Sequence, residues 1–164
     1  MQKKFVMAVV AVAMAAVVGV SAFAAEGTAV PSITGDEGTS FTSQADASDT
    51  AKNAYNTIVA TEGSIADKLT AVAGSDNVTA AAMAVGVKNG NELSVRAVGD
   101  VAVSSKTGEV SLKVAGMKDG ETAAVMYLDA NGKWVVTTAV VVNGKLTFKL
   151  PYSATVIILT KKAA

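Results

Sequence analysis

The C-terminal half of the chain is divided by turn signals at intervals of roughly a dozen residues, a spacing typical of short strands. This spacing constrains the fold more than any other feature. Asn-Gly and Asp-Gly supply the positive φ angles that tight hairpin turns require. The turn signals are Asn89-Gly90, Thr107-Gly108, Asp119-Gly120, Asn131-Gly132 and Asn143-Gly144. Runs rich in valine, threonine and aromatic residues separate them, so we expect several short antiparallel strands.

The predicted strands are of two kinds. In residues 110–114 and 145–150, apolar and polar side chains alternate, which predicts strands with one face on the core and one in water. Residues 139–142 and 156–159 are continuously apolar, which predicts central strands covered on both faces. We therefore expect a mainly β fold, an antiparallel β-sandwich over residues 77–164.

A short helical pair is predicted before the strands, over residues 48–76. Ser48 or Asp49 can cap the first helix, and Ser64 with Asp67 forms a capping-box-like pattern at the second. Gly63 separates the two helices and Gly74 ends the second. The apolar positions at helical spacing are Ala51, Ala54, Tyr55, Ile58 and Val59, followed by Ile65, Leu69 and Val72. Both helices are short, so they must pack on something larger.

Residues 1–24 have the pattern of a cleavable signal peptide. Lys3 and Lys4 precede an uninterrupted stretch of apolar residues and glycine over residues 5–20. Ala22 and Ala24 then form the A-x-A arrangement of a signal-peptidase site, which predicts cleavage between Ala24 and Ala25. The alternative is a retained membrane anchor, although the run is at the short end of the about 20 residues that a spanning helix needs.

Residues 25–47 are rich in Gly, Ser, Thr and acidic residues and have little periodic apolar content. This composition predicts a flexible leader. If the signal segment is retained, the same residues become a tether that presents the folded domain outside the membrane. The chain has no lipid-accepting cysteine after the apolar run, no second apolar span and no Leu-Pro-x-Thr-Gly motif, so we expect a soluble exported domain.

Composition argues against several chemistries. The chain contains no histidine and no cysteine, so histidine-based triads and the commonest metal ligands are absent. Loss of Lys3 and Lys4 with the signal lowers the basic residues from 14 to 12 against 14 acidic ones, and Arg96 is the only arginine. Nucleic acid is therefore not an expected partner. For nucleophilic catalysis without histidine, a Ser/Lys pair is the remaining option; Ser104, Ser105 and Lys106 are adjacent in sequence, but their side chains diverge if they lie in a turn.

Residues 108–160 also resemble a recurrent module of secreted and surface proteins of bacteria, many of them Gram-positive. The matching segments are residues 110–114, 116–120, 124–128, 129–134 and 143–148, with a final strand after Tyr152-Ser153. The resemblance implies an immunoglobulin-like (Ig-like) β-sandwich near the C-terminus of an envelope protein. It is a pattern of strands and turns, and it defines no functional residues. Such proteins often end in a wall or membrane anchor, and no such segment is expected from residues 150–164.

Tyr127 and Trp134 are the candidate binding residues. Side chains alternate along a strand, and hairpin loops of two or four residues would both place these aromatics on one face. There they form a platform for a sugar or a protein partner, or they cover the core and brace the helices.

No metal site or cofactor is expected. Asp129-x-Asn131-Gly132 shares the opening of a calcium loop but lacks its other oxygen ligands, so a hairpin turn is favoured. Asp36 and Glu37 are adjacent, and no further carboxylate completes a ligand set.

Taken together, these features predict a secreted, non-enzymatic protein of the bacterial envelope or extracellular space. Its expected role is structural or adhesive, with a protein or glycan partner. The alternatives are a carbohydrate-binding module and a subunit that assembles by β-strand addition. A membrane association is expected only if the signal segment is not cleaved.

Overall fold

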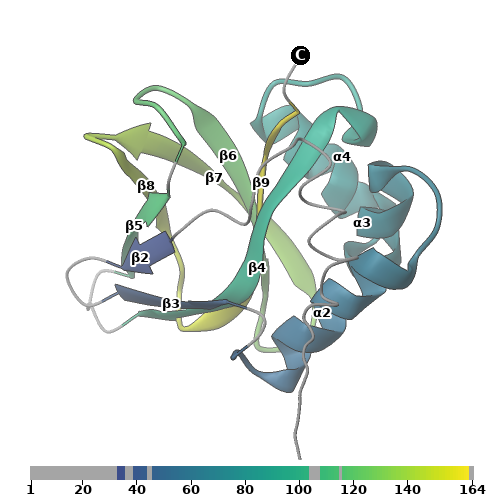
Figure 1. Cartoon of the computed structure of the whole chain (residues 1–164), viewed down its shortest axis with the longest axis horizontal. Coiled ribbons are helices and arrows are strands. Elements are labelled where there is room, and N and C mark those ends of the chain that lie inside the picture. Colours follow the sequence, from purple (N-terminus) through teal and green to yellow (C-terminus); the bar gives the residue numbers. More distant parts are fainter. Residues whose placement is uncertain (1–32, 36–38, 44–45, 104–107, 115, 163–164) are drawn as a thin grey trace, which may run out of the picture.

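The computed structural model of the chain describes residues 33–35, 39–43, 46–103, 108–114 and 116–162 (Figure 1). The predicted signal peptide lies outside the described residues. The helices are α2 (Asp49–Ala60), α3 (Ile65–Ala73), α4 (Ser75–Ala84) and the short 3-10 helix η2 (Gly90–Glu92). The strands are β2 (Ile33–Gly35), β3 (Thr39–Ser43), β4 (Leu93–Val103), β5 (Glu109–Val114), β6 (Thr122–Leu128), β7 (Trp134–Val142), β8 (Lys145–Lys149) and β9 (Ala154–Lys161). No helix in this part of the chain is long and apolar enough to cross a membrane.

All eight described strands belong to one antiparallel sheet, in the order β2-β5-β8-β7-β6-β9-β4-β3. The sheet curls so strongly that its two edge strands, β2 and β3, contact each other, which gives a nearly closed barrel (Figure 1). The mainly β, antiparallel fold is confirmed. The Ig-like sandwich is not, because strand pairing gives one continuous curled sheet.

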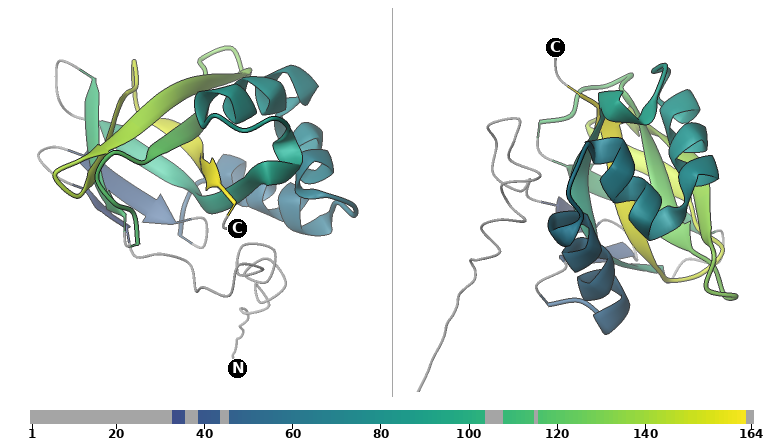
Figure 2. Two further views of the ribbon diagram at one scale, coloured as in Figure 1. Left: turned by 90° about the horizontal axis from the view of Figure 1, so that it is seen from above. Right: turned by 90° about the vertical axis from the view of Figure 1, so that its right-hand side faces the viewer.

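Two apolar cores share the central strands of this sheet. The inner core fills the barrel, and the outer core lies between the barrel wall and the helices, which cover one side of it (Figure 2). Strand β9 contributes Val156 and Ile158 to the inner core and Ile157 and Leu159 to the outer core. The continuously apolar run over residues 156–159 is therefore buried on both faces, as predicted.

The second apolar run, over residues 139–142, behaves differently. Ala139 and Val141 point into the barrel, but Val140 is 38% exposed and Val142 is 49% exposed. The helices cover only the first part of β7, where Trp134 and Val136 pack against the outer core. The prediction of burial on both faces is wrong for this strand because the helical layer ends before it does.

The helical segment has one helix more than predicted. The first two helices begin as expected: the Ser48 hydroxyl accepts a hydrogen bond from the Ala51 amide, and Ser64 and Asp67 form a capping box. After Gly74, however, residues 75–84 form α4, although residues 77–84 were predicted to belong to the β region. The missed signal is an apolar face at helical spacing, whose members are all buried: Val78, Ala81, Ala82 and Val85.

The turn signals also differ in outcome. Asn143 and Gly144 have φ angles of 53° and 78° and connect β7 to β8 in the predicted tight hairpin. Asn89 and Gly90 instead start η2, so the predicted hairpin is wrong there. A Cβ on Gly90 would meet the Val78 side chain and lie 3.0 Å from the Ala66 Cβ. This glycine is needed for close helix packing rather than for a turn.

Two strands lie within residues 25–47, which were predicted to be a flexible leader. Strand β2 pairs with β5, and β3 pairs with β4 over the whole of Thr39–Ser43. Phe41 from β3 packs against the inner core. Strands β2 and β3 of the predicted leader thus form part of the barrel wall. Short strands with few apolar residues gain their stability from pairing, which a composition argument does not see.

The burial of Tyr55 on α2 gives a prediction for alkaline pH. Burial raises its pKa from 10.0 to about 12. The folded state therefore favours the neutral phenol, so this stabilising contribution is present below pH 10.0 and is lost as the pH rises toward about 12. In a spectrophotometric titration of the folded protein, we expect a late tyrosine step, which Tyr55→Phe removes. A titration curve that Tyr55→Phe leaves unchanged at high pH would contradict this.

Candidate functional site

Tyr127 and Trp134 do not form a shared platform. The β6–β7 register pairs Leu128 with Trp134 and Tyr127 with Val135, so the two aromatic side chains point to opposite faces of the sheet. Trp134 packs on the outer core beneath the helices, while Tyr127 packs on the inner core. Trp134 thus braces the helical layer, which was one of the two structural roles considered for it.

The expectation of one shared face is wrong because of the loop length. The loop spans residues 129–133, since the Asp129 amide donates to the Lys133 carbonyl. This is an odd number of residues, whereas loops of two and four residues were assumed. A shift of one residue in register moves a side chain to the other face of a sheet.

The Asp129 carboxylate serves the turn itself. Its Oδ1 atom accepts hydrogen bonds from the amides of Asn131 and Lys133, both at 2.8 Å. Gly132 has a φ angle of 78°, a left-handed backbone conformation that glycine adopts readily in turns. The turn prediction is confirmed. Within the described ranges, no group of three or more acidic residues is placed to hold a metal ion. Asp36, Glu37, Ser104, Ser105 and Lys106 lie outside those ranges.

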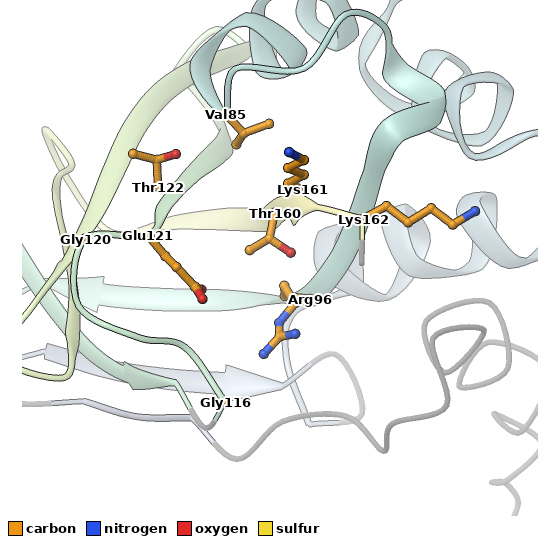
Figure 3. Close-up of a pocket in the computed structure, with 9 residues that line it drawn as sticks. All are labelled: Val85, Arg96, Gly116, Gly120, Glu121, Thr122, Thr160, Lys161 and Lys162. Carbon is orange, nitrogen blue, oxygen red and sulfur yellow. The ribbon is translucent and has the colours of Figure 1, made fainter. Parts of the chain in front are cut away.

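The strongest candidate site is a hollow of about 530 Å³ at one end of the barrel (Figure 3). We call it the mouth hollow. Its volume lies within the roughly 300–1,000 Å³ of small-molecule sites, and barrel mouths are a preferred location for such sites. It is lined by Val85, Arg96, Gly116, Gly120, Glu121, Thr122, Thr160, Lys161 and Lys162.

Arg96 enters this hollow because of a local irregularity in β4. The β4–β9 register shifts between Val95 and Ala97, which leaves Arg96 at a β-bulge. A bulge re-aims the side chain that it carries, and bulges are over-represented next to binding sites. The guanidinium extends toward Gly116, where a Cβ would lie 3.2 Å from an Arg96 terminal nitrogen (Figure 3). The absence of a side chain at Gly116 thus leaves room for the guanidinium.

Strand alternation brings the other polar groups to the same place. Ile158 points into the barrel, so Thr160, two residues later, lies on the inner side at the mouth. Ala123 and Val125 also point inward, so Glu121, two residues before Ala123, lies on the inner side as well. The Glu121 carbonyl accepts a hydrogen bond from the Val141 amide at 2.9 Å, so the backbone of Glu121 is still bound to strand β7. Figure 3 shows the Glu121 carboxylate directed toward the region of the Arg96 guanidinium.

The lining carries three cationic groups and one anionic group. Arg96 is half-buried, whereas Lys161, Lys162 and Glu121 are exposed at the rim. The Lys162 side chain points away from the centre of the hollow (Figure 3). The local excess of positive charge contrasts with the even balance of 14 basic and 14 acidic residues in the whole chain.

A second hollow, of about 320 Å³, lies toward the opposite end of the β4–β9 pair and contains Asp100. Its carboxylate accepts hydrogen bonds from the Ser48 amide at 2.7 Å, the Ser48 hydroxyl at 3.1 Å and the Thr155 hydroxyl at 2.7 Å. These bonds tie the start of α2 to the sheet. Asp100 therefore has a structural role, and the mouth hollow remains the candidate.

Sequence reasoning missed the mouth hollow. One signal was present: Arg96 is the only arginine and stands between Val95 and Ala97 in the segment that forms β4. Sequence alternation groups it with Ser94 and gives no sign of the bulge that re-aims its side chain. Its convergence with Glu121 and Thr160 depends on strand order, which no local pattern reveals.

No protein-family model matches the chain, and neither does any curated protein or solved structure.

Proposed function

We propose that the chain is an exported, non-enzymatic binding protein that holds a ligand in the mouth hollow. The single observation that carries this proposal is the hollow itself, which has the volume of a small-molecule site. It is built from residues far apart in the sequence: Arg96 from β4, Gly116 and Glu121 from the segment around the start of β6, and Thr160 from β9.

The lining chemistry supports binding rather than catalysis. It offers cations, two threonine hydroxyls and a carboxylate, which are groups that orient and hold a polar ligand. A nucleophilic mechanism needs a hydroxyl activated by an adjacent base, and the chain has no histidine for that role. Glu121 is exposed at the rim, whereas catalytic acids are often poised by burial.

The proposed location is the bacterial envelope or the extracellular space, on the strength of the N-terminal pattern over residues 1–24. The strand and turn pattern of residues 108–160, which resembles that of a module of secreted proteins, is in keeping with the same location. In this proposal the partner is a protein or a glycan that presents a small polar group to the mouth hollow.

The two alternatives have less support. A carbohydrate-binding module based on Tyr127 and Trp134 needs an aromatic platform, and these side chains lie on opposite faces. Assembly by strand addition needs an accessible sheet edge. The edge strands β2 and β3 contact each other across the seam of the barrel, so each partly covers the other.

Two measurements test the proposed function. The exported protein is purified and its N-terminus sequenced; a chain that begins at Ala25 supports export with cleavage, and one that begins at Met1 contradicts it. The mature protein is then titrated with a panel of small sugars, sugar acids, organic acids and peptides while amide resonances are followed by NMR. We expect ligand-dependent shifts at Thr122 and Thr160. A panel that moves no resonance of the mouth hollow would refute the binding site.

A further inference from the structure

We propose that the ligand of the mouth hollow is a small carboxylate that also carries a hydrogen-bond donor, such as a sugar acid or a hydroxy acid. This inference rests on the proposed function and names the ligand class of the same site. Two lining groups of opposite charge carry it: the half-buried Arg96 guanidinium, and the Glu121 carboxylate, which is directed toward the region of that guanidinium (Figure 3).

The guanidinium of Arg96 fits a carboxylate by geometry. Its planar fork presents N–H donors that bind both carboxylate oxygens at once. Arg96 starts from a bulge in a strand whose flanking residues, Val95 and Ala97, are buried at 3% and 2% exposure. The backbone that carries the side chain is therefore held in place, so binding a ligand orders only the side chain and not the strand. A guanidinium has five donors, so contacts with the protein leave others for a ligand.

The position of Arg96 strengthens the attraction between its guanidinium and a ligand carboxylate. The side chain is half-buried, so its charge is less screened than that of a surface lysine. Lys161 at the rim adds positive potential over the entrance, which favours the approach of an anion. The Thr160 hydroxyl lies on the inner side between these groups and can donate to a ligand oxygen (Figure 3).

Glu121 restricts which anion fits. Its carboxylate can only accept hydrogen bonds when ionised, so it pairs with a hydroxyl or ammonium group on the ligand. It also repels a second negative charge placed close to Arg96. A doubly charged phosphate is thereby disfavoured, and a neutral sugar forms no ion pair with the guanidinium. A ligand with one carboxylate and a neighbouring donor satisfies both groups.

The test uses the mature protein and four probes: glucuronate, glucose, lactate and inorganic phosphate. Dissociation constants are measured by NMR titration at low ionic strength. We expect glucuronate and lactate to bind at the mouth hollow at least about tenfold more tightly than glucose, because only they pair with a guanidinium. Arg96→Gln should remove this preference. Glu121→Gln should weaken glucuronate binding and tighten phosphate binding by about threefold to tenfold.

Two controls keep the result interpretable. Glu121 is exposed, so its variant reports on the ligand even if the half-buried Arg96 variant loses stability. Lys149→Gln removes one charge at an exposed position on β8, toward the other end of the barrel, and should leave all four affinities unchanged.

The outcomes separate this inference from the proposed function. If glucose binds at the hollow as well as glucuronate, or if phosphate binds best in the natural protein, the ligand class is wrong while the binding site stands. If Glu121→Gln changes neither glucuronate nor phosphate binding, the role of Glu121 is refuted. If none of the four probes, and no member of the broader panel, moves resonances of the hollow, both proposals fail.

Discussion

Replacement of Asp100 by alanine is expected to lower the free energy of unfolding by about 3 kcal/mol, among the largest effects of any polar substitution in the chain. The carboxylate accepts three hydrogen bonds, two from Ser48 and one from Thr155. Bonds to a charged acceptor are stronger than neutral ones. Thr155 is only 7% exposed, so its hydroxyl would be left buried without this acceptor. The variant also releases the start of α2, whose N-cap is Ser48.

Chemical denaturation of Asp100→Ala and Asp100→Asn measures this effect. The asparagine variant keeps an accepting oxygen for one or two of the bonds but loses the charge, so we expect an intermediate loss. Glu62→Ala is the matched control, because it removes an exposed carboxylate between α2 and α3. A loss for Asp100→Ala no larger than that for Glu62→Ala would show that the bonds to Ser48 and Thr155 do not hold the helix to the sheet.

Features set by neighbouring residues could be predicted from the sequence. The capping box of Ser64 and Asp67 depends on residues three apart, and the structure contains it. The tight hairpin at Asn143-Gly144 depends on two adjacent residues, and it is also present. In both cases the energetic preference lies within one turn of the backbone, so no knowledge of the tertiary fold was needed.

Features set by distant partners could not be predicted in the same way. The composition of residues 25–47 resembles a leader, but Thr39–Ser43 pairs along its whole length with β4, far along the chain. The opposite error occurs at Gly90, where a turn signal reflects close packing against Val78 and Ala66. A glycine in a sequence does not reveal whether it permits an unusual φ angle or a close approach.

The candidate site shows the same limit. The faces of Tyr127 and Trp134 depend on whether the intervening loop has an odd or even number of residues, and Asn-Gly alone does not fix that number. The mouth hollow depends on a single bulge at Arg96 and on the placement of β9 between β4 and β6. Both are properties of the whole sheet.

Replacement of Gly99 by valine is expected to detach β3 from the barrel and to lower the free energy of unfolding by about 3 kcal/mol, a large value for overpacking. A Cβ at this position would overlap the Thr42 carbonyl oxygen and lie 2.7 Å from the Phe41 Cζ. Phe41 packs on the inner core and Thr42 belongs to the β3–β4 ladder. The Thr42 carbonyl is backbone of the β3–β4 ladder and cannot move without disturbing strand pairs, so the steric conflict must be relieved by displacing β3.

Hydrogen exchange distinguishes this local effect from a general loss of stability. In Gly99→Val, the amides of residues 39–43 should lose protection before those of β9, since β3 is an edge strand. Ala102→Val is the matched control. Ala102 lies on β4, as Gly99 does, but at an exposed position, so the added bulk should change stability little. The opposite result is that both variants have the same free energy of unfolding and that residues 39–43 exchange at the same rate in each. The pairing of β3 with β4 would then not stabilise the barrel, and the prediction of a flexible leader would hold for these residues. If only Gly99→Val loses protection there, β3 is an integral part of the barrel.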